Sequence, residues 1–150
     1  MIKLALDLAT KVTGIAKLTE EGVVVYEIDT DPIALLDHIL SILTSHSPNN
    51  VMVYIEEVYV GSNKSTAIAL AKLSGFIVYT LQMYEYKTQM VYPATYRKLL
   101  KSVGVTKKLE YQKYWSTELG TKVTDNMSDA LTMLLFMEGL NPNTTPIAVE

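Results

Sequence analysis

Two carboxylates end apolar segments, where an acidic side chain is costly unless its charge is compensated. Asp7 lies near the end of residues 2–8, and Glu56 ends residues 51–56. A buried carboxylate needs a cation, a hydrogen-bond donor or water beside it. If both segments are parallel neighbouring strands, these side chains meet at the carboxyl ends, where α/β sheets gather ligands. Glu57 competes with Glu56, because successive strand residues point to opposite faces and the sequence alone does not choose between them.

A third acidic group opens an apolar helix near the end of the chain. Asp125 and Asp129 are four residues apart, and Asn126 and Asp129 are three apart, so either pair shares one helical face. Capping is the alternative role for Asp125, with Thr124 as the other N-cap candidate. Asp129 lies too far along the helix to cap it, which favours a functional role.

Three or four converging carboxylates, without His or Cys among them, indicate a hard cation such as Mg²⁺ or Mn²⁺. Two such ions roughly 3.5–4 Å apart stabilise both the attacking and the leaving oxygen of a phosphodiester, so no covalent nucleophile is needed. Adding two Mg²⁺ (+4) to the formal net charge of −3 gives +1. The acidic composition therefore does not exclude a DNA ligand.

The basic residues are unevenly distributed along the chain. Six of the 13 lie between positions 97 and 113, whereas residues 20–37 carry six acids and no base. Either the basic stretch meets an anion, or its helices simply have solvated charged sides. Its members are Arg97, Lys98, Lys101, Lys107, Lys108 and Lys113.

Length and composition predict one folded domain. The 150 residues are 49% hydrophobic and 19% charged, which excludes a disordered chain. Zero cysteines exclude disulfides, thiolate zinc and thiol catalysis and fit a reducing cytoplasm. No 18-residue run is apolar and uncharged, and the first residues lack a signal-peptide pattern, so we expect no membrane partner.

The elements that must position the acids follow from the hydrophobic pattern. Residues 2–8, 14–19 and 23–28 predict an antiparallel meander, and residues 51–56 and 87–92 predict two parallel strands. Helices are expected over about 32–43, 63–83, 94–102, 106–119 and 125–139. The prediction is an α/β domain over residues 1–140, with a mixed five-stranded sheet flanked by helices, followed by a flexible C-terminal tail at 141–150.

Three blocks of this sequence resemble the RuvC-type Holliday junction resolvases. Asp7-Leu-Ala-Thr-Lys-Val-Thr-Gly14 is similar to the first-strand motif, and Ile55-Glu-Glu-Val-Tyr59 with Asn63-Lys-Ser-Thr66 is similar to the second. Asp129-Ala-Leu, just after Asp125 and Asn126, resembles the family's C-terminal acidic helix. The resemblance implies a ribonuclease-H-like fold, a homodimer and Mg²⁺-dependent nicking of four-way DNA junctions. Departures from the family pattern fit a phage or other mobile-element branch, and we expect a cytoplasmic location, in the host cytoplasm if the protein is viral.

The resemblance also assigns residues. It selects Glu56 over Glu57 and matches Asp7 and Asp129 to family carboxylates. The usual spacing places the remaining helix ligand at Asn126, while Asp125 is the stronger metal ligand one residue earlier. The family's Pro-Gly after the first Asp is replaced by Leu8-Ala9. The predicted catalytic and metal-binding carboxylates, holding two Mg²⁺ or Mn²⁺, are Asp7, Glu56, Asp125 and Asp129.

Contacts to branched DNA are implied in the same way. Tyr59 matches an aromatic that stacks on an unpaired base, with packing or surface exposure as its alternative role. Family lysines flank a Gly-containing loop, which implies a catalytic Lys107 and an earlier lysine at Lys98 or Lys101. The full DNA-binding prediction comprises Tyr59, Asn63, Lys64, Arg97, Lys98, Lys101, Lys107, Lys108 and Lys113.

Other functions stay open on the sequence. A broader structure-selective nuclease would act on flaps, forks or RNA–DNA hybrids, and a non-catalytic module would bind branched DNA without cutting it. Actin-like ATPases and sugar kinases also open with an Asp-containing strand and a Thr/Gly turn. They normally need two such domains, and 150 residues hold one.

Overall fold

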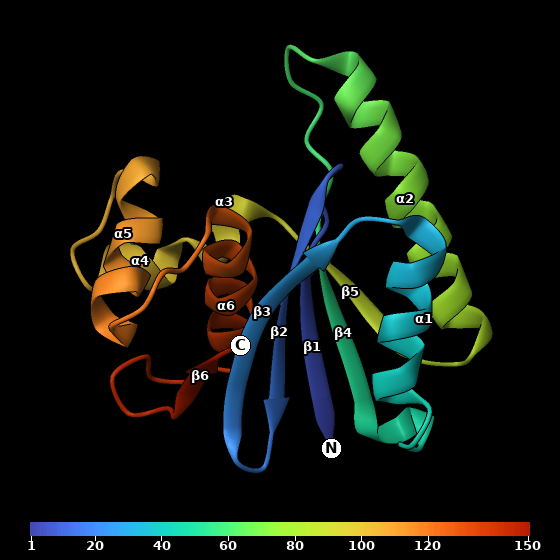
Figure 1. Ribbon diagram of the computed structural model, residues 1–150, viewed down its shortest axis with the longest axis horizontal. Helices are drawn as coiled ribbons and strands as arrows, with labels where there is room; N and C mark the ends of the chain where they lie inside the picture. The colour runs from blue at the N-terminus through green and yellow to red at the C-terminus, as the bar shows by residue number, and fades with distance from the viewer.

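A mixed sheet between two layers of helices forms the centre of the molecule, shown in Figure 1 as a computed structural model that describes residues 1–150. The strand order is β5-β4-β1-β2-β3-β6. The predicted meander is formed by β1 (Ile2–Asp7), β2 (Val12–Thr19) and β3 (Gly22–Asp29). β4 (Val51–Glu56) lies parallel to β1, and β5 (Lys87–Val91) lies parallel to β4. The predicted fold class is thereby confirmed.

The sheet has six strands, which corrects the predicted five. The sixth, β6 (Ile147–Val149), lies within the segment expected as a flexible tail and pairs in parallel with β3. The backbone amide of Glu150 also donates to the carbonyl of Val25, at 3.0 Å. Without β6, β3 would be an edge strand with unpaired backbone groups. The three residues of β6 cover part of that edge. The preceding polar stretch, Asn-Pro-Asn-Thr-Thr-Pro, masks this short strand in the sequence.

One face of the sheet is covered by α1 (Pro32–Leu43) and α2 (Lys64–Met83), with the 3₁₀ turn η1 (Pro48–Asn50) between α1 and β4. Asp31 caps α1, because its carboxylate accepts the backbone amides of Ile33 and Ala34 at 3.1 Å. Apolar side chains of both helices form one core with side chains of β1, β2 and β4. These include Leu35, Ile39, Leu43, Leu73, Ile77, Leu81, Leu4, Leu6, Ile15, Val53 and Ile55.

By length and composition alone, α2 would also suffice to cross a membrane. Core helices of globular domains pass the same test, so this is weak evidence for a membrane span. In this fold Leu73, Ile77 and Leu81 of α2 are buried in the core between this helix and the sheet.

The opposite face carries α3 (Pro93–Tyr96), α4 (Lys98–Ser102), α5 (Lys108–Leu119) and α6 (Asp125–Met137). The single helix predicted over 94–102 is divided at Arg97, which ends α3 and precedes α4. Trp115 of α5 is anchored on α6, because its indole Nε1 donates to Thr132 Oγ1 at 2.9 Å. This buried layer fixes α6 over the strands that carry the acidic residues.

Candidate active site

The strand registers bring the first two carboxylates together. In the parallel pair β1 and β4, Leu6 lies opposite Ile55, so Asp7 and Glu56 follow as neighbours at the carboxyl ends. Asp7 also lies opposite Gly14 in the antiparallel pair with β2. The site is therefore at the sheet edge where α/β folds gather their ligands.

The third carboxylate arrives from α6, which begins directly over β2. A Cβ at Gly14 would lie 2.1 Å from the carbonyl oxygen of Asn126, so only glycine permits this approach. The Asn126 side-chain amide donates to the Val12 carbonyl at 2.9 Å, which ties the helix start to β2. Thr124 caps α6 by accepting the backbone amide of Met127 at 3.3 Å. Asp129, one turn further along, is placed beside the strand ends.

Three carboxylates form one cluster. Ligand oxygens of Asp7, Glu56 and Asp129 all lie within 4.8 Å of one another. Asp7 and Asp129 are only 5% and 6% exposed, and Glu56 is half-buried. The cluster lines a cavity of about 230 Å³, together with Asp125, Asn126, Arg97 and Lys108 among others.

Burial and mutual repulsion make Asp7 and Asp129 hard to ionise. Burial raises the pKa of Asp7 well above its usual value, and the hydrogen bond and charge of Glu56 raise this pKa further. Burial also raises the pKa of Asp129 to about 7, with the charge of Glu56 adding to the shift and Arg97 opposing it. A site that resists ionisation in this way gains stability from a bound cation.

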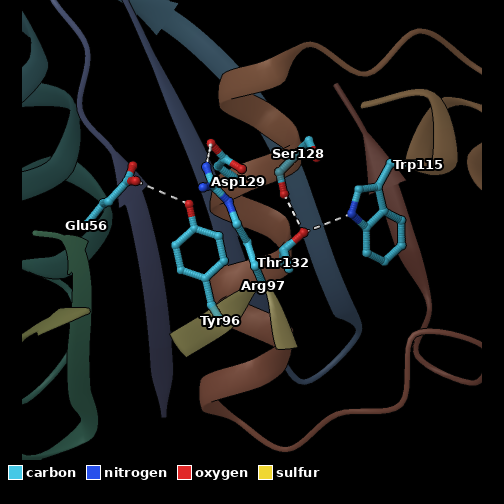
Figure 2. Close-up of polar contacts among 7 residues, drawn as sticks. All are labelled: Glu56, Tyr96, Arg97, Trp115, Ser128, Asp129 and Thr132. Carbon is cyan, nitrogen blue, oxygen red and sulfur yellow. Dashed lines mark hydrogen bonds and ion pairs between the residues drawn. The ribbon is translucent and has the colours of Figure 1, made fainter. Parts of the chain in front are cut away.

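Two consecutive residues contact the cluster from the α3–α4 segment (Figure 2). The buried Tyr96 hydroxyl donates to Glu56 Oε1 at 3.3 Å, and Arg97 Nη2 lies 3.6 Å from Asp129 Oδ2. Burial raises the pKa of Tyr96, and the charge of Glu56 raises it further, so this phenol keeps the proton that it donates to Glu56. The pair holds two of the three carboxylates in place.

The acidic residues named from the sequence separate into two groups. Glu56, not Glu57, joins Asp7 and Asp129 in the cluster. Asp125 is an exposed residue that lines the same cavity, and its charge raises the pKa of both Asp7 and Asp129. It lies outside the compact group of three, so a fourth ligand from Asp125 stays a prediction.

The basic residues divide in the same way. Arg97 and Lys108 line the acidic cavity, and the predicted catalytic Lys107 does not. Lys107, Lys98, Lys101 and Lys113 are exposed. Their proposed DNA contacts remain predictions.

Three predicted DNA-binding residues lie in the loop between β4 and α2 or at the start of α2. Asn63 caps α2, with its side-chain oxygen accepting the Thr66 amide at 3.1 Å, and Lys64 is the first residue of that helix. Tyr59 is 80% exposed and lines both the acidic cavity and an adjoining one of about 480 Å³. This adjoining cavity is also lined by Tyr92 and Pro93.

Sequence reasoning missed Tyr96 and the internal role of Arg97. The sequence predicts Arg97 only as one of the DNA-binding residues, and its ion pair with Asp129 also places it beside the acidic cluster. A signal was present, because Pro93 follows β5 and the carboxyl end of β5 lies beside Glu56 in the sheet. Residues just beyond such a strand end belong to the same site.

The donor set of the cluster fits a hard divalent cation. All three ligand groups are carboxylates, and neither His nor Cys belongs to the cluster. Oxygen donors of this kind suit Mg²⁺ and Mn²⁺ and disfavour softer metals. Asp7, Glu56 and Asp129 are the residues that would hold the metal.

Comparison with known proteins supports the fold assignment. No protein-family model matches the sequence, and no curated protein matches it. The fold is similar to a solved structure of Thermus thermophilus RuvC in complex with a Holliday junction substrate. That comparison has a TM-score of 0.67 and 14% identity, over 91% of each chain. A second Thermus thermophilus RuvC structure gives a TM-score of 0.63 and 16% identity, over 93% of this chain and 96% of the other. The chain therefore has a RuvC-type fold, as the three sequence blocks predict.

Proposed function

We propose that this protein is a divalent-metal-dependent endonuclease that nicks branched DNA and resolves four-way junctions. The observation that carries the proposal is the cluster of Asp7, Glu56 and Asp129 at the carboxyl ends of β1 and β4. The RuvC-type fold supports the choice of substrate, because one similar protein was solved on a Holliday junction. Two Mg²⁺ or Mn²⁺ ions per site are part of this proposal.

The chain's own residues have distinct tasks in such a reaction. Asp7, Glu56 and Asp129 hold the ions, and Tyr96 orients Glu56 through its hydroxyl. When bound, the ions would supply an activated water and stabilise the charge on the departing oxygen. The exposed Lys108 lines the cavity, and in this proposal its ammonium group contacts the phosphates of a strand and positions it without reading bases.

In this proposal the exposed ring of Tyr59 stacks on an unpaired base beside the cut strand. It projects from the loop after Glu56 and lines the acidic cavity. Stacking of this kind tolerates any base, which suits a junction whose sequence varies.

A second copy of the chain is the partner that symmetric cutting requires, because a two-fold axis places two sites on related strands. The outer face of α2 exposes the apolar side chains of Ile68, Tyr79 and Met83. We therefore place the dimer contact on α2. Sedimentation should show a dimer for the wild type and a monomer for the Tyr79→Glu, Met83→Glu double variant. A wild-type monomer at micromolar concentration would exclude the dimer.

The direct test compares end-labelled four-way junction, flap, fork and RNA–DNA hybrid substrates side by side, with Mg²⁺ or with EDTA. We expect paired symmetric nicks in the junction that need the metal. Equal cutting of all substrates would support a broader structure-selective nuclease, and binding without any cut would support an architectural module. Asp7→Asn and Glu56→Gln should bind the junction without cutting it, while Glu57→Gln should still cut.

A further inference from the structure

Arg97 occupies an unusual position for a cation expected to meet DNA at the surface. Its side chain is 21% exposed, and its guanidinium lies 3.6 Å from Asp129. The guanidinium carbon also lies 5.7 Å and 5.6 Å from the ring centres of Tyr96 and Tyr111, within the range of cation–π attraction. The side chain is therefore held inside the site by two aromatic rings and one carboxylate.

The hydrogen bonding of this guanidinium is incomplete. Its buried Nε has no hydrogen-bond partner, and the contact with Asp129 is a single pair at 3.6 Å rather than a close two-bond fork. Guanidinium groups bind phosphate through two parallel N–H bonds, and such a contact is stronger than the one observed. The guanidinium therefore has donor capacity that Asp129 does not use, and Arg97 lines the cavity that a phosphate would enter.

The same contact bears on metal binding. Asp129 is one of three carboxylates that would share the ions, and one of its oxygens faces the guanidinium. A guanidinium cannot be deprotonated in a protein, so it always carries its charge into the cluster. A second divalent ion beside Asp129 would have to approach this positive charge, and like charges at such distances repel.

We propose that Arg97 is an internal counter-cation that limits the DNA-free site to one divalent ion. When a strand enters, its phosphate takes over the guanidinium, Asp129 is released, and the second ion binds only with DNA. This inference rests on the proposed nuclease function. It adds that the second metal ion, and with it the complete metal site, is present only when DNA is bound.

The test is a Mn²⁺ titration of the DNA-free protein at pH 8, followed by electron paramagnetic resonance of the free ion. We expect one tightly bound ion per wild-type chain. Arg97→Met should bind a second ion at least about tenfold more tightly than the wild type does. Arg97→Lys keeps the charge and should behave as the wild type. Lys87→Gln removes an exposed cation from the start of β5, at the end of the strand away from the carboxylates, and controls for the change in overall charge.

Each outcome is informative. Two equally tight ions in the wild type, or no change of stoichiometry in Arg97→Met, would overturn the counter-cation role even if the protein cuts junctions. A wild type that neither binds Mn²⁺ nor cuts a junction would overturn the nuclease proposal itself. Near-ultraviolet circular dichroism verifies the folding of each variant. If Arg97→Met does not fold, the more polar Arg97→Gln has the same expected result.

Discussion

Replacing Asp7 by Asn should stabilise the metal-free protein at pH 8. The pKa of this buried carboxyl is raised, so the folded state keeps a proton that the unfolded chain has lost. Stability from such a group is present at acidic pH and falls as the pH rises through the folded pKa. Asp129 contributes in the same direction, between its ordinary pKa of 3.8 and its folded value of about 7. Asparagine stays neutral at every pH. The variant therefore keeps the stability that the wild type loses as Asp7 ionises.

The distances within the acidic cluster set the size of this change in the free energy of unfolding. Two charges 4.8 Å apart, the outer limit for the ligand oxygens of Asp7, Glu56 and Asp129, repel by about 3.5 kcal/mol at an effective dielectric constant of about 20. We therefore expect Asp7→Asn to raise the free energy of unfolding by about 2–4 kcal/mol at pH 8 and by less than about 0.5 kcal/mol at pH 4.

Urea denaturation in EDTA at pH 8 and at pH 4 measures the difference in the free energy of unfolding between Asp7→Asn and the wild type. Asp37→Asn, an exposed acid on α1, is the matched control and should change stability by less than about 0.5 kcal/mol. Added Mg²⁺ should stabilise the wild type more than Asp7→Asn. An Asp7→Asn variant that is no more stable than the wild type at pH 8 would refute the crowding of these carboxylates.

Three further predictions test the parts around the cluster. Gly14→Ala should lower the free energy of unfolding by about 3 kcal/mol in urea, because its Cβ would lie 2.1 Å from the Asn126 carbonyl oxygen; an unchanged midpoint would contradict the close approach of α6 to β2. Tyr59→Ala should weaken junction binding by about 1–3 kcal/mol in a fluorescence anisotropy titration and leave Mn²⁺ binding unchanged, whereas equal affinity would exclude stacking by this ring. Lys108→Gln should weaken junction binding and reduce the salt dependence of log Kd by about one unit, and an unaltered salt slope would remove Lys108 from the phosphate contacts.

Much of the fold follows from local patterns in the sequence. The meander and the two parallel strands are visible because their apolar runs are short, rich in β-branched residues and bounded by turns. α6 is predicted at Asp125 and begins there. The strand β6 is missed because its three residues have no hydrophobic period, and its pairing depends on the open edge of β3.

The acidic cluster is predictable for a different reason. Asp7 and Glu56 interrupt apolar strands, and an unexplained buried charge indicates function. The residues around the acidic cluster are placed by contacts between distant segments of the chain, which no local sequence pattern encodes. Tyr96 and Arg97 reach Glu56 and Asp129 only because β5 ends beside β4. The charge pattern marks the basic stretch and does not distinguish Arg97, which points into the site, from Lys98, which is exposed.

Anomalous diffraction from crystals of the protein soaked in Mn²⁺ tests the metal centre most directly. A manganese peak should lie within coordination distance of oxygens from Asp7, Glu56 and Asp129, and it should disappear in Asp7→Asn. Crystals that show no manganese at these carboxylates, or that bind it only elsewhere on the surface, would contradict a metal-dependent nuclease built on this cluster.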